Sequence, residues 1–239
     1  MTFKYKAVFL DWDDTIGDWT SAEHKALSDV YDTYHLNDIY PTLNDYLAAY
    51  HPYNLSLWAK YGRGEITKDL LHFERFYHPL TADGRDSLLG KDKAKLAHEI
   101  GNTFLQLTNK YFSLLPDSAQ TVHYLESKYP LTIISNGFSE VQHYKFAHSG
   151  LQNCFKHILI SDEIGINKPQ PEIFRIALER NGVQANEAIM IGDSYTSDIA
   201  GAKAAGIDQI WVRKAPANAK NGESATFIVS DITEVTKIL

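Results

Sequence analysis

The chain has 239 residues, 44% of them apolar, and its 30 acidic and 23 basic side chains give a formal net charge of −7 at pH 7. This length allows one large domain or two smaller ones, and the ordinary apolar content excludes a disordered or collagen-like chain. The acidic balance argues against a nucleic acid polymer as a partner, since proteins that bind one need a basic face. A single mononucleotide stays compatible with this balance, because a local pocket can be positive.

The sequence predicts neither secretion nor membrane insertion. The apolar run of residues 7–10 ends at Asp11 and is too short for the apolar core of a signal peptide. No stretch approaches the roughly 20 apolar residues of a membrane span. We expect a soluble, cytoplasmic protein without a membrane partner.

Six short apolar runs predict the strands of a parallel sheet. Each run is continuous rather than alternating, as expected of a strand that is buried on both faces. They cover residues 7–10, 131–134, 157–160, 188–191, 209–212 and 226–229. From residue 117 onward these runs alternate with helical patterns at residues 118–129, 171–180 and 198–205. This alternation predicts a doubly wound, Rossmann-like α/β sheet.

Residues 17–115 lack such runs and show helical periodicity instead. Three apolar stripes are present: Ala22, Ala26, Val30 and Tyr34; Ile66, Leu70, Phe73, Phe76 and Leu80; Ala94, Ala97, Ile100, Phe104, Leu107, Tyr111 and Leu114. Such stripes are typical of a helix-bundle core, and a segment of roughly a hundred residues can form a domain. We therefore predict a discontinuous core domain, residues 1–16 and 116–239, with an inserted helical cap domain, residues 17–115.

The sequence offers few soft metal ligands. Cys154 is the only cysteine, so neither a disulfide framework nor a thiolate metal cluster is expected, and we expect a small buried side chain there. The ten histidines are scattered; His143 and His148, for example, are not spaced as a helical metal pair. We therefore assign no metal role to a histidine.

The first predicted strand ends in Asp11-Trp12-Asp13-Asp14-Thr15. Alternate side chains of a strand share a face, so Asp11 and Asp13 project together, at the strand end where α/β sheets bind ligands. Two adjacent carboxylates call for a cation, and oxygen ligands favour Mg²⁺. One carboxylate can attack phosphorus while the other, protonated, donates to the leaving oxygen. Acidic turns after strands are also common, so this motif alone equally fits a structural role.

Three further polar segments adjoin the same predicted sheet. Ser135-Asn136-Gly137 offers a hydroxyl, an amide and backbone N–H groups before a helix, which suits a phosphate. Lys168, in a loop with two prolines, can neutralise a phosphoryl group and an attacking carboxylate. Asp193 ends a predicted buried strand where apolar residues are expected, whereas Asp198 is equally typical of a helix cap. Each segment alone has an ordinary structural explanation, but together they supply what phosphoryl transfer requires.

At these residues the chain resembles the haloacid dehalogenase superfamily. The segment from Asp11 to Thr15 resembles the first motif of that family, Ser135 the second, Lys168 before Pro169 the third, and Gly192-Asp193 through Asp198 the fourth. The order and strand context also match, and the resemblance covers the whole chain. It implies that Asp11 is the nucleophile and that Asp13 is the general acid and then the general base.

The resemblance also implies how ligands are held. Mg²⁺ is expected on the Asp11 and Asp193 carboxylates and the Asp13 backbone carbonyl, with Asp198 supporting it from nearby. Ser135 and Lys168 are expected to bind the phosphoryl oxygens. Thr15 and Asn136 are further candidates for phosphate or substrate binding. The insertion after the first motif is similar to the helical cap of the subgroup that carries its cap there.

Two features narrow the expected reaction. Dehalogenases of the superfamily lack the second aspartate of the first motif, so Asp13 indicates phosphate chemistry, in which the leaving oxygen needs a proton. Asp14 stands where much of the family has glycine, and this resembles the branch that acts on pyrimidine 5′-monophosphates. Residues 57–62 (Leu-Trp-Ala-Lys-Tyr-Gly), 64–67 (Gly-Glu-Ile-Thr) and 136–138 (Asn-Gly-Phe) are similar to that branch too. We expect a Mg²⁺-dependent phosphomonoester hydrolase that forms an aspartyl phosphate, with a mononucleotide favoured as substrate.

Other readings stay open at this point. The same superfamily contains phosphatases of sugar phosphates and other small metabolites, and also phosphomutases, although the glycine usual at the end of the mutases' first motif is absent here. A non-catalytic binding protein of the same fold is the remaining alternative, and the presence of all four motifs argues against it. Trp58, Tyr61 and Phe138 are candidates for stacking on a base, although packing is the commoner role of an aromatic side chain.

Overall fold

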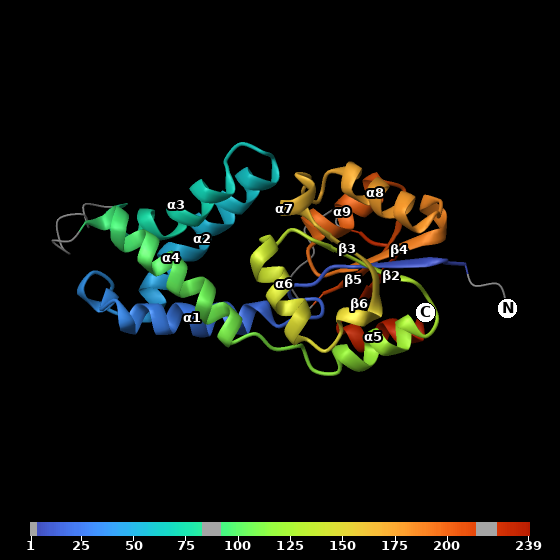
Figure 1. Cartoon of the computed structure of the whole chain (residues 1–239), viewed down its shortest axis with the longest axis horizontal. Coiled ribbons are helices and arrows are strands. Elements are labelled where there is room, and N and C mark those ends of the chain that lie inside the picture. The colour runs from blue at the N-terminus through green and yellow to red at the C-terminus, as the bar shows by residue number, and fades with distance from the viewer. Residues whose placement is uncertain (1–3, 83–91, 214–223) are drawn as a thin grey trace. The chain divides into compact units, whose positions relative to one another are not determined.

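The computed structural model describes residues 4–82, 92–213 and 224–239. The chain divides into two units (Figure 1). The sheet unit consists of Met1–Trp19 and Ser113–Leu239, and the helical unit of Thr20–Phe112. None of the helices in the described ranges is long and apolar enough to cross a membrane.

The sheet unit carries, within the described residues, a six-stranded sheet in the order β3-β2-β1-β4-β5-β6. The strands are β1 (Ala7–Leu10), β2 (Leu131–Ser135), β3 (Phe155–Ile160), β4 (Ala188–Gly192), β5 (Asp208–Val212) and β6 (Phe227–Val229). Every neighbouring pair is parallel, which confirms the predicted α/β class. The strand order reverses between β1 and β4, so the carboxyl ends of these two strands form the crevice where such sheets bind ligands.

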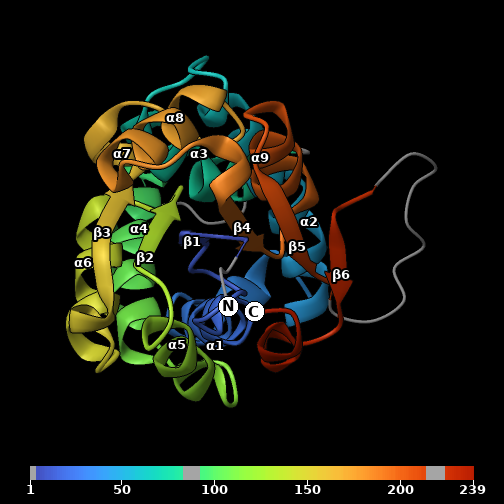
Figure 2. The same cartoon turned by 90° about the vertical axis from the view of Figure 1, so that its right-hand side faces the viewer.

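Helices cover both faces of this sheet (Figure 2). The sheet unit contains α5 (Ser118–Glu126), α6 (Ser139–His148), α7 (Ser161–Ile164), α8 (Pro171–Asn181) and α9 (Ala200–Ala204), and the short turns η3 (Gln152–Cys154), η4 (Ala185–Glu187), η5 (Tyr195–Ile199) and η6 (Ile232–Lys237). In both views α8 and α9 lie on one face of the sheet, and α5 lies on the other. The first strand is thereby enclosed from both sides, and all four of its residues are buried.

The two faces of β1 pack against different partners because its side chains alternate. Ala7 and Phe9 belong to one core cluster with Ile173 and Phe174 of α8. Trp12, just beyond the strand, lies edge-on to Phe146 of α6 with ring centroids 4.5 Å apart. The strand that carries the first motif is therefore fixed by apolar packing on both faces, in addition to its pairing with β2 and β4.

The helical unit contains α1 (Trp19–Thr33), η1 (Leu36–Asp38), α2 (Leu43–Gly62), α3 (Lys68–Thr81) and α4 (Lys93–Lys110). Its core is aromatic: the ring of Phe76 lies 5.6 Å from that of Tyr50 and 5.3 Å from that of Phe104, between centroids. The guanidinium of Arg75 is buried and lies 4.9 Å from the Phe104 ring. A cation over an aromatic face recovers part of the cost of its burial.

The predicted stripes of this unit are right only in part. Ala22, Ala26 and Val30 are buried as predicted, but Leu70 is 42% exposed and Ala94 is exposed as well. The buried face of α3 runs instead through residues that include Leu71, Arg75 and Phe76. Apolar periodicity misplaces this face because a charged side chain, Arg75, occupies a core position.

The helix α2 has no predicted stripe at all. Its buried face combines Tyr46, Tyr50, Asn54 and Leu57, and Pro52 lies inside the helix. These positions have helical spacing, but tyrosine and asparagine carry polar groups. A search for apolar residues at helical spacing therefore does not find this face. A proline in the interior is usually a helix breaker, which conceals the helix further.

Replacing Phe9 by alanine tests the packing of β1. Phe9 is fully buried, so Phe9→Ala should lower the free energy of unfolding by about 3–5 kcal/mol. Ile228→Ala, at a side chain that is 52% exposed, should lower it by less than about 1 kcal/mol. Urea unfolding followed by circular dichroism measures both, and equal losses would contradict this account of the core.

Candidate active site

The polar side chains singled out in the sequence gather at the carboxyl ends of three neighbouring strands. Asp11 directly follows β1, Ser135 ends β2, and Asp193 directly follows β4. Parallel strands bring these ends to one edge of the sheet, although the residues are far apart in sequence. Lys168 and Asp198 reach the same place from the segments that follow α7 and β4.

Three carboxylates form the centre of this site. Asp11, Asp193 and Asp198 each offer one oxygen, and these atoms lie within 4.8 Å of one another. Asp11 and Asp198 are buried and Asp193 is half-buried. The buried Thr15 hydroxyl lies between two of them, 3.2 Å from Asp11 Oδ2 and 3.4 Å from Asp193 Oδ1. Thr15 therefore contacts the carboxylates directly.

Lys168 supplies the positive charge of this cluster. Its ammonium is buried and lies 2.5 Å from Asp11 Oδ1 and 2.7 Å from Asp198 Oδ1. Burial by itself lowers the pKa of Lys168, but the carboxylates of Asp11 and Asp198 outweigh it and raise the pKa above its ordinary value. The lysine therefore stays charged.

One lysine does not balance three carboxylates. Burial, and then the Asp198 and Asp13 carboxylates, raise the pKa of Asp11 to about 7 against the opposing effect of Lys168. Burial and the neighbouring carboxylates, Asp11 first, raise the pKa of Asp193 to about 8. The cluster thus has excess negative charge and donors that are all oxygen, which suits Mg²⁺. Asp11, Asp193 and Asp198 are the residues that fit such an ion.

Asp13 is held by other partners, on α6. Gln142 Nε2 donates to Asp13 Oδ2 at 2.7 Å, and Lys145 Nζ donates to Asp13 Oδ1 at 2.5 Å. Gln142 and Lys145 are both buried, and the Lys145 ammonium lies 4.3 Å from the centre of the Trp19 ring. The two aspartates of the first motif therefore have separate polar surroundings.

Sequence reasoning missed Gln142 and Lys145. Both lie on the buried face of α6 together with Val141 and Phe146. In a sequence, a glutamine and a lysine in a helix are usually solvated. Their helical spacing relative to Val141 and Phe146 is the signal that could have found them, because it places two polar side chains on an apolar face.

The side chain of Asn136 clamps the backbone of Lys168. The Lys168 N–H donates to Asn136 Oδ1 at 2.8 Å, and Asn136 Nδ2 donates to the Lys168 carbonyl at 2.9 Å. Asn136 thus fixes the loop from which the ammonium reaches Asp11. Its neighbour Ser135 accepts a hydrogen bond from the Gly137 N–H at 3.1 Å, so the buried Ser135 hydroxyl keeps its proton for donation.

The backbone after Asp11 wraps into a tight turn. Asp14 has φ of 60°, and its N–H donates to the Gly17 carbonyl at 2.7 Å. Aspartate adopts this left-handed conformation more readily than most residues, and glycine adopts it freely. The turn thus gives a physical reason why glycine is common at this position in the family and why aspartate can replace it.

Asp198 approaches the backbone closely. A Cβ atom on Gly192 would lie 2.4 Å from Asp198 Oδ2, so glycine is required there, and the Ser194 N–H donates to the same oxygen at 3.0 Å. The chain makes a π-helical turn over η5 before α9 begins at Ala200. The helix predicted at 198–205 therefore begins later, at Ala200, and the side chain of Ser194 caps the preceding η5 turn.

The fold and this site agree with a known family. Residues 5–206 match the family described as haloacid dehalogenase-like hydrolase. The chain belongs to this family, as its resemblance in sequence indicated.

Individual relatives span nearly the whole chain. The HAD-hydrolase YfnB of Bacillus subtilis (strain 168) is 32% identical over 212 residues, which are 87% of this chain and 84% of YfnB. The pyrimidine 5′-nucleotidase YjjG of Escherichia coli (strain K12) is 27% identical over 237 residues, covering 99% and 98%. A glyceraldehyde 3-phosphate phosphatase of Methanothermobacter thermautotrophicus is 31% identical over 244 residues, covering 98% and 99%. The crystal structure of YfnB bound to magnesium, which reveals interdomain movement in that protein, matches with a TM-score of 0.82 at 27% identity over 99% of each chain.

Removing one carboxylate should weaken metal binding. Asp193→Asn takes one oxygen ligand with its charge from the cluster, and we expect Mg²⁺ affinity to fall about tenfold or more. Isothermal titration calorimetry measures it. Asp32→Asn, the same change at an exposed aspartate of the helical unit, is the matched control. Equal affinities of the two variants for Mg²⁺ would rule out Asp193 as a ligand.

Proposed function

We propose that this chain is a Mg²⁺-dependent phosphatase that hydrolyses small phosphate monoesters through an aspartyl phosphate on Asp11. The observation that carries the proposal is the setting of Asp11, which lies at the switch point of the sheet with Lys168 2.5 Å away. A second carboxyl group, Asp13, is held separately on Gln142 and Lys145. A nucleophile and a proton donor in different surroundings are what phosphate ester hydrolysis requires.

Asp11 and Asp193, together with the Asp13 backbone carbonyl, would hold Mg²⁺, and Asp198 would support the ion from nearby. When bound, the ion neutralises negative charge on the carboxylates and on the phosphoryl oxygens. Lys168 adds a fixed positive charge beside the nucleophile, which favours the approach of an anionic substrate. The hydroxyl of Ser135 is available to donate to a phosphoryl oxygen.

The reaction follows from these positions. A carboxylate oxygen of Asp11 attacks phosphorus, the bond to the ester oxygen breaks, and Asp13 gives its proton to the leaving alcohol. Asp13 then takes a proton from a water molecule whose oxygen attacks the phosphorus of the aspartyl phosphate, and the bond from phosphorus to the Asp11 oxygen breaks. Inorganic phosphate leaves, and both carboxyl groups return to their starting states.

We favour a pyrimidine nucleoside monophosphate as the substrate. YjjG, which is named for this activity, matches almost the whole chain, and the residues after Asp13 and within 57–67 resemble that branch. Trp58 and Tyr61 of α2 are half-buried, with ring centroids 5.8 Å apart, and are our candidates for stacking on a base. Phe138 is 4% exposed, which favours packing. The cap domain predicted for residues 17–115 is part of this proposal.

A sugar phosphate is the second candidate. The relative named glyceraldehyde 3-phosphate phosphatase also matches the chain over nearly its full length. The residues of the sheet unit described above would serve either substrate, because their proposed partners are the phosphate and the leaving oxygen, which both substrates share. The choice between them therefore falls to residues outside the carboxylate cluster.

Phosphate release from a substrate panel tests the proposal. With Mg²⁺, we expect the fastest release from UMP, dUMP or dTMP, and none in EDTA. Asp11→Asn should remove nearly all turnover because it removes the nucleophile, while circular dichroism shows the fold retained. Release from sugar phosphates alone would reject the nucleotide substrate, and undiminished turnover by Asp11→Asn would reject the mechanism.

Changing Lys145 tests how Asp13 is positioned. Lys145→Met removes one of the two side chains that hold Asp13. Because Asp13 is the proposed general acid, its misplacement should lower kcat by about tenfold to a hundredfold with KM little changed. The loss should be larger for an alkyl phosphate than for p-nitrophenyl phosphate, whose leaving group needs less protonation. Steady-state kinetics on both esters measure this difference.

Two further variants complete that test. Lys237→Met, at a side chain that is 77% exposed, is the matched control and should keep wild-type kinetics. Gln142→Leu removes the other partner of Asp13 and should show the same dependence on the leaving group. An equal loss on both esters would mean that Lys145 acts only through stability.

A further inference from the structure

A second group of metal-ligating side chains lies at the other end of the strands. His123 and Glu126 are on α5, and Cys154 ends η3. Glu126 precedes β2 and Cys154 precedes β3, so this group is at the amino ends of the strands. Asp11 and Asp193 follow the carboxyl ends. β3 has six residues and so spans about 20 Å, which makes the group separate from the carboxylate cluster.

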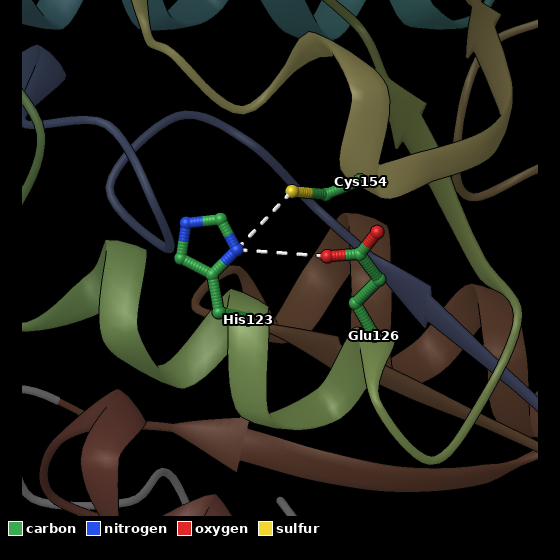
Figure 3. Close-up of side chains that lie close together, drawn as sticks. All are labelled: His123, Glu126 and Cys154. Carbon is green, nitrogen blue, oxygen red and sulfur yellow. Dashed lines mark hydrogen bonds and ion pairs between the residues drawn. The ribbon is translucent and has the colours of Figure 1, made fainter.

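The ligand atoms converge on one point (Figure 3). His123 Nδ1 lies 3.6 Å from Cys154 Sγ and 3.5 Å from Glu126 Oε2, and all three ligand atoms are within 4.8 Å of one another. Tetrahedral Zn²⁺, with bonds of about 2.0–2.1 Å to nitrogen or oxygen and about 2.3 Å to sulfur, holds its ligands about 3.3–3.6 Å apart. The two separations from His123 Nδ1 therefore match those of a zinc site, and the third ligand atom lies within 4.8 Å.

The surroundings of these three side chains allow a metal ion to enter from solvent, and their chemistry favours zinc. An open cleft of ≈ 440 Å³ is lined by residues that include Glu126, Asn153, Cys154 and Phe155. The side chains of His123 and Glu126 are 59% and 43% exposed, so water can supply a fourth ligand. A thiolate and an imidazole with a single carboxylate favour zinc over magnesium, which prefers oxygen alone.

We propose that His123, Glu126 and Cys154 form a zinc-binding site, with water as the fourth ligand. The bound ion would connect α5 to the turn before β3, two segments that are 28 residues apart or more. The Cys154 S–H bond breaks as the S–Zn bond forms, and its proton passes to solvent. Burial, with Glu126, raises the pKa of the Cys154 thiol to about 11, so the thiol is protonated until a metal displaces the proton. This site does not depend on the proposed phosphatase activity.

Cobalt titration of the full, metal-free chain tests the site. Co²⁺ takes the same tetrahedral ligands as zinc, and its bond to a thiolate gives a charge-transfer band in the near ultraviolet. We expect this band to saturate at one equivalent and to vanish when Zn²⁺ displaces Co²⁺. Cys154→Ser should abolish it, and His123→Gln or Glu126→Gln should weaken Co²⁺ binding about tenfold or more.

Two controls separate this site from the carboxylate cluster. Asp193→Asn should leave the cobalt band unchanged, because that cluster contains no sulfur. Zn²⁺ at about a hundred times its Kd should raise the Tm by about 5–10 °C, and Cys154→Ser should lose this rise while keeping Mg²⁺-dependent turnover. Absence of the charge-transfer band, or an equal rise in Tm for Cys154→Ser, would overturn the proposal.

Discussion

The ion pairs of Lys168 are the interaction on which the rest of the site depends. Its buried ammonium lies between Asp11 and Asp198, and without it the buried carboxylates would repel one another and pay a large desolvation cost. Even so, the positive charge falls short of the negative charge. A site with this imbalance is suited to a cation and to an anionic substrate. Burial first, and then the neighbouring carboxylates, raise the pKa of Asp11 and Asp193.

Several backbone features exist to keep that arrangement in place. Asn136 fixes the loop of Lys168 through both groups of its amide. Gly192 leaves room for the Asp198 carboxylate, and Asp14 takes a left-handed conformation so that the chain can turn after Asp11. The apolar packing of β1 supports all of these features, because it holds the end of the strand, and with it the backbone of the aspartates that follow, in one position.

The parallel sheet separates two kinds of chemistry by the direction of its strands. At the carboxyl ends, the possible metal ligands are carboxylate oxygens, and the ammonium groups of Lys168 and Lys145 lie beside them. At the amino ends, His123, Glu126 and Cys154 present nitrogen, oxygen and sulfur within 4.8 Å. The six residues of β3 alone span about 20 Å between the two ends, so the two groups of side chains do not share ligand atoms. The two sites differ in the metals they suit for a plain chemical reason, the softness of their donors.

The sequence by itself determined the fold class, the strands and most of the polar residues at the carboxyl ends. This was possible because a buried parallel strand has a continuous apolar sequence and is followed here by a polar motif. It did not determine the buried faces of α2 and α3, where Arg75 and Asn54 occupy core positions. Only the tertiary structure brought Gln142 and Lys145 to Asp13 and Cys154 to His123. Such contacts join segments distant in sequence, and local periodicity carries no information about which polar side chains will meet.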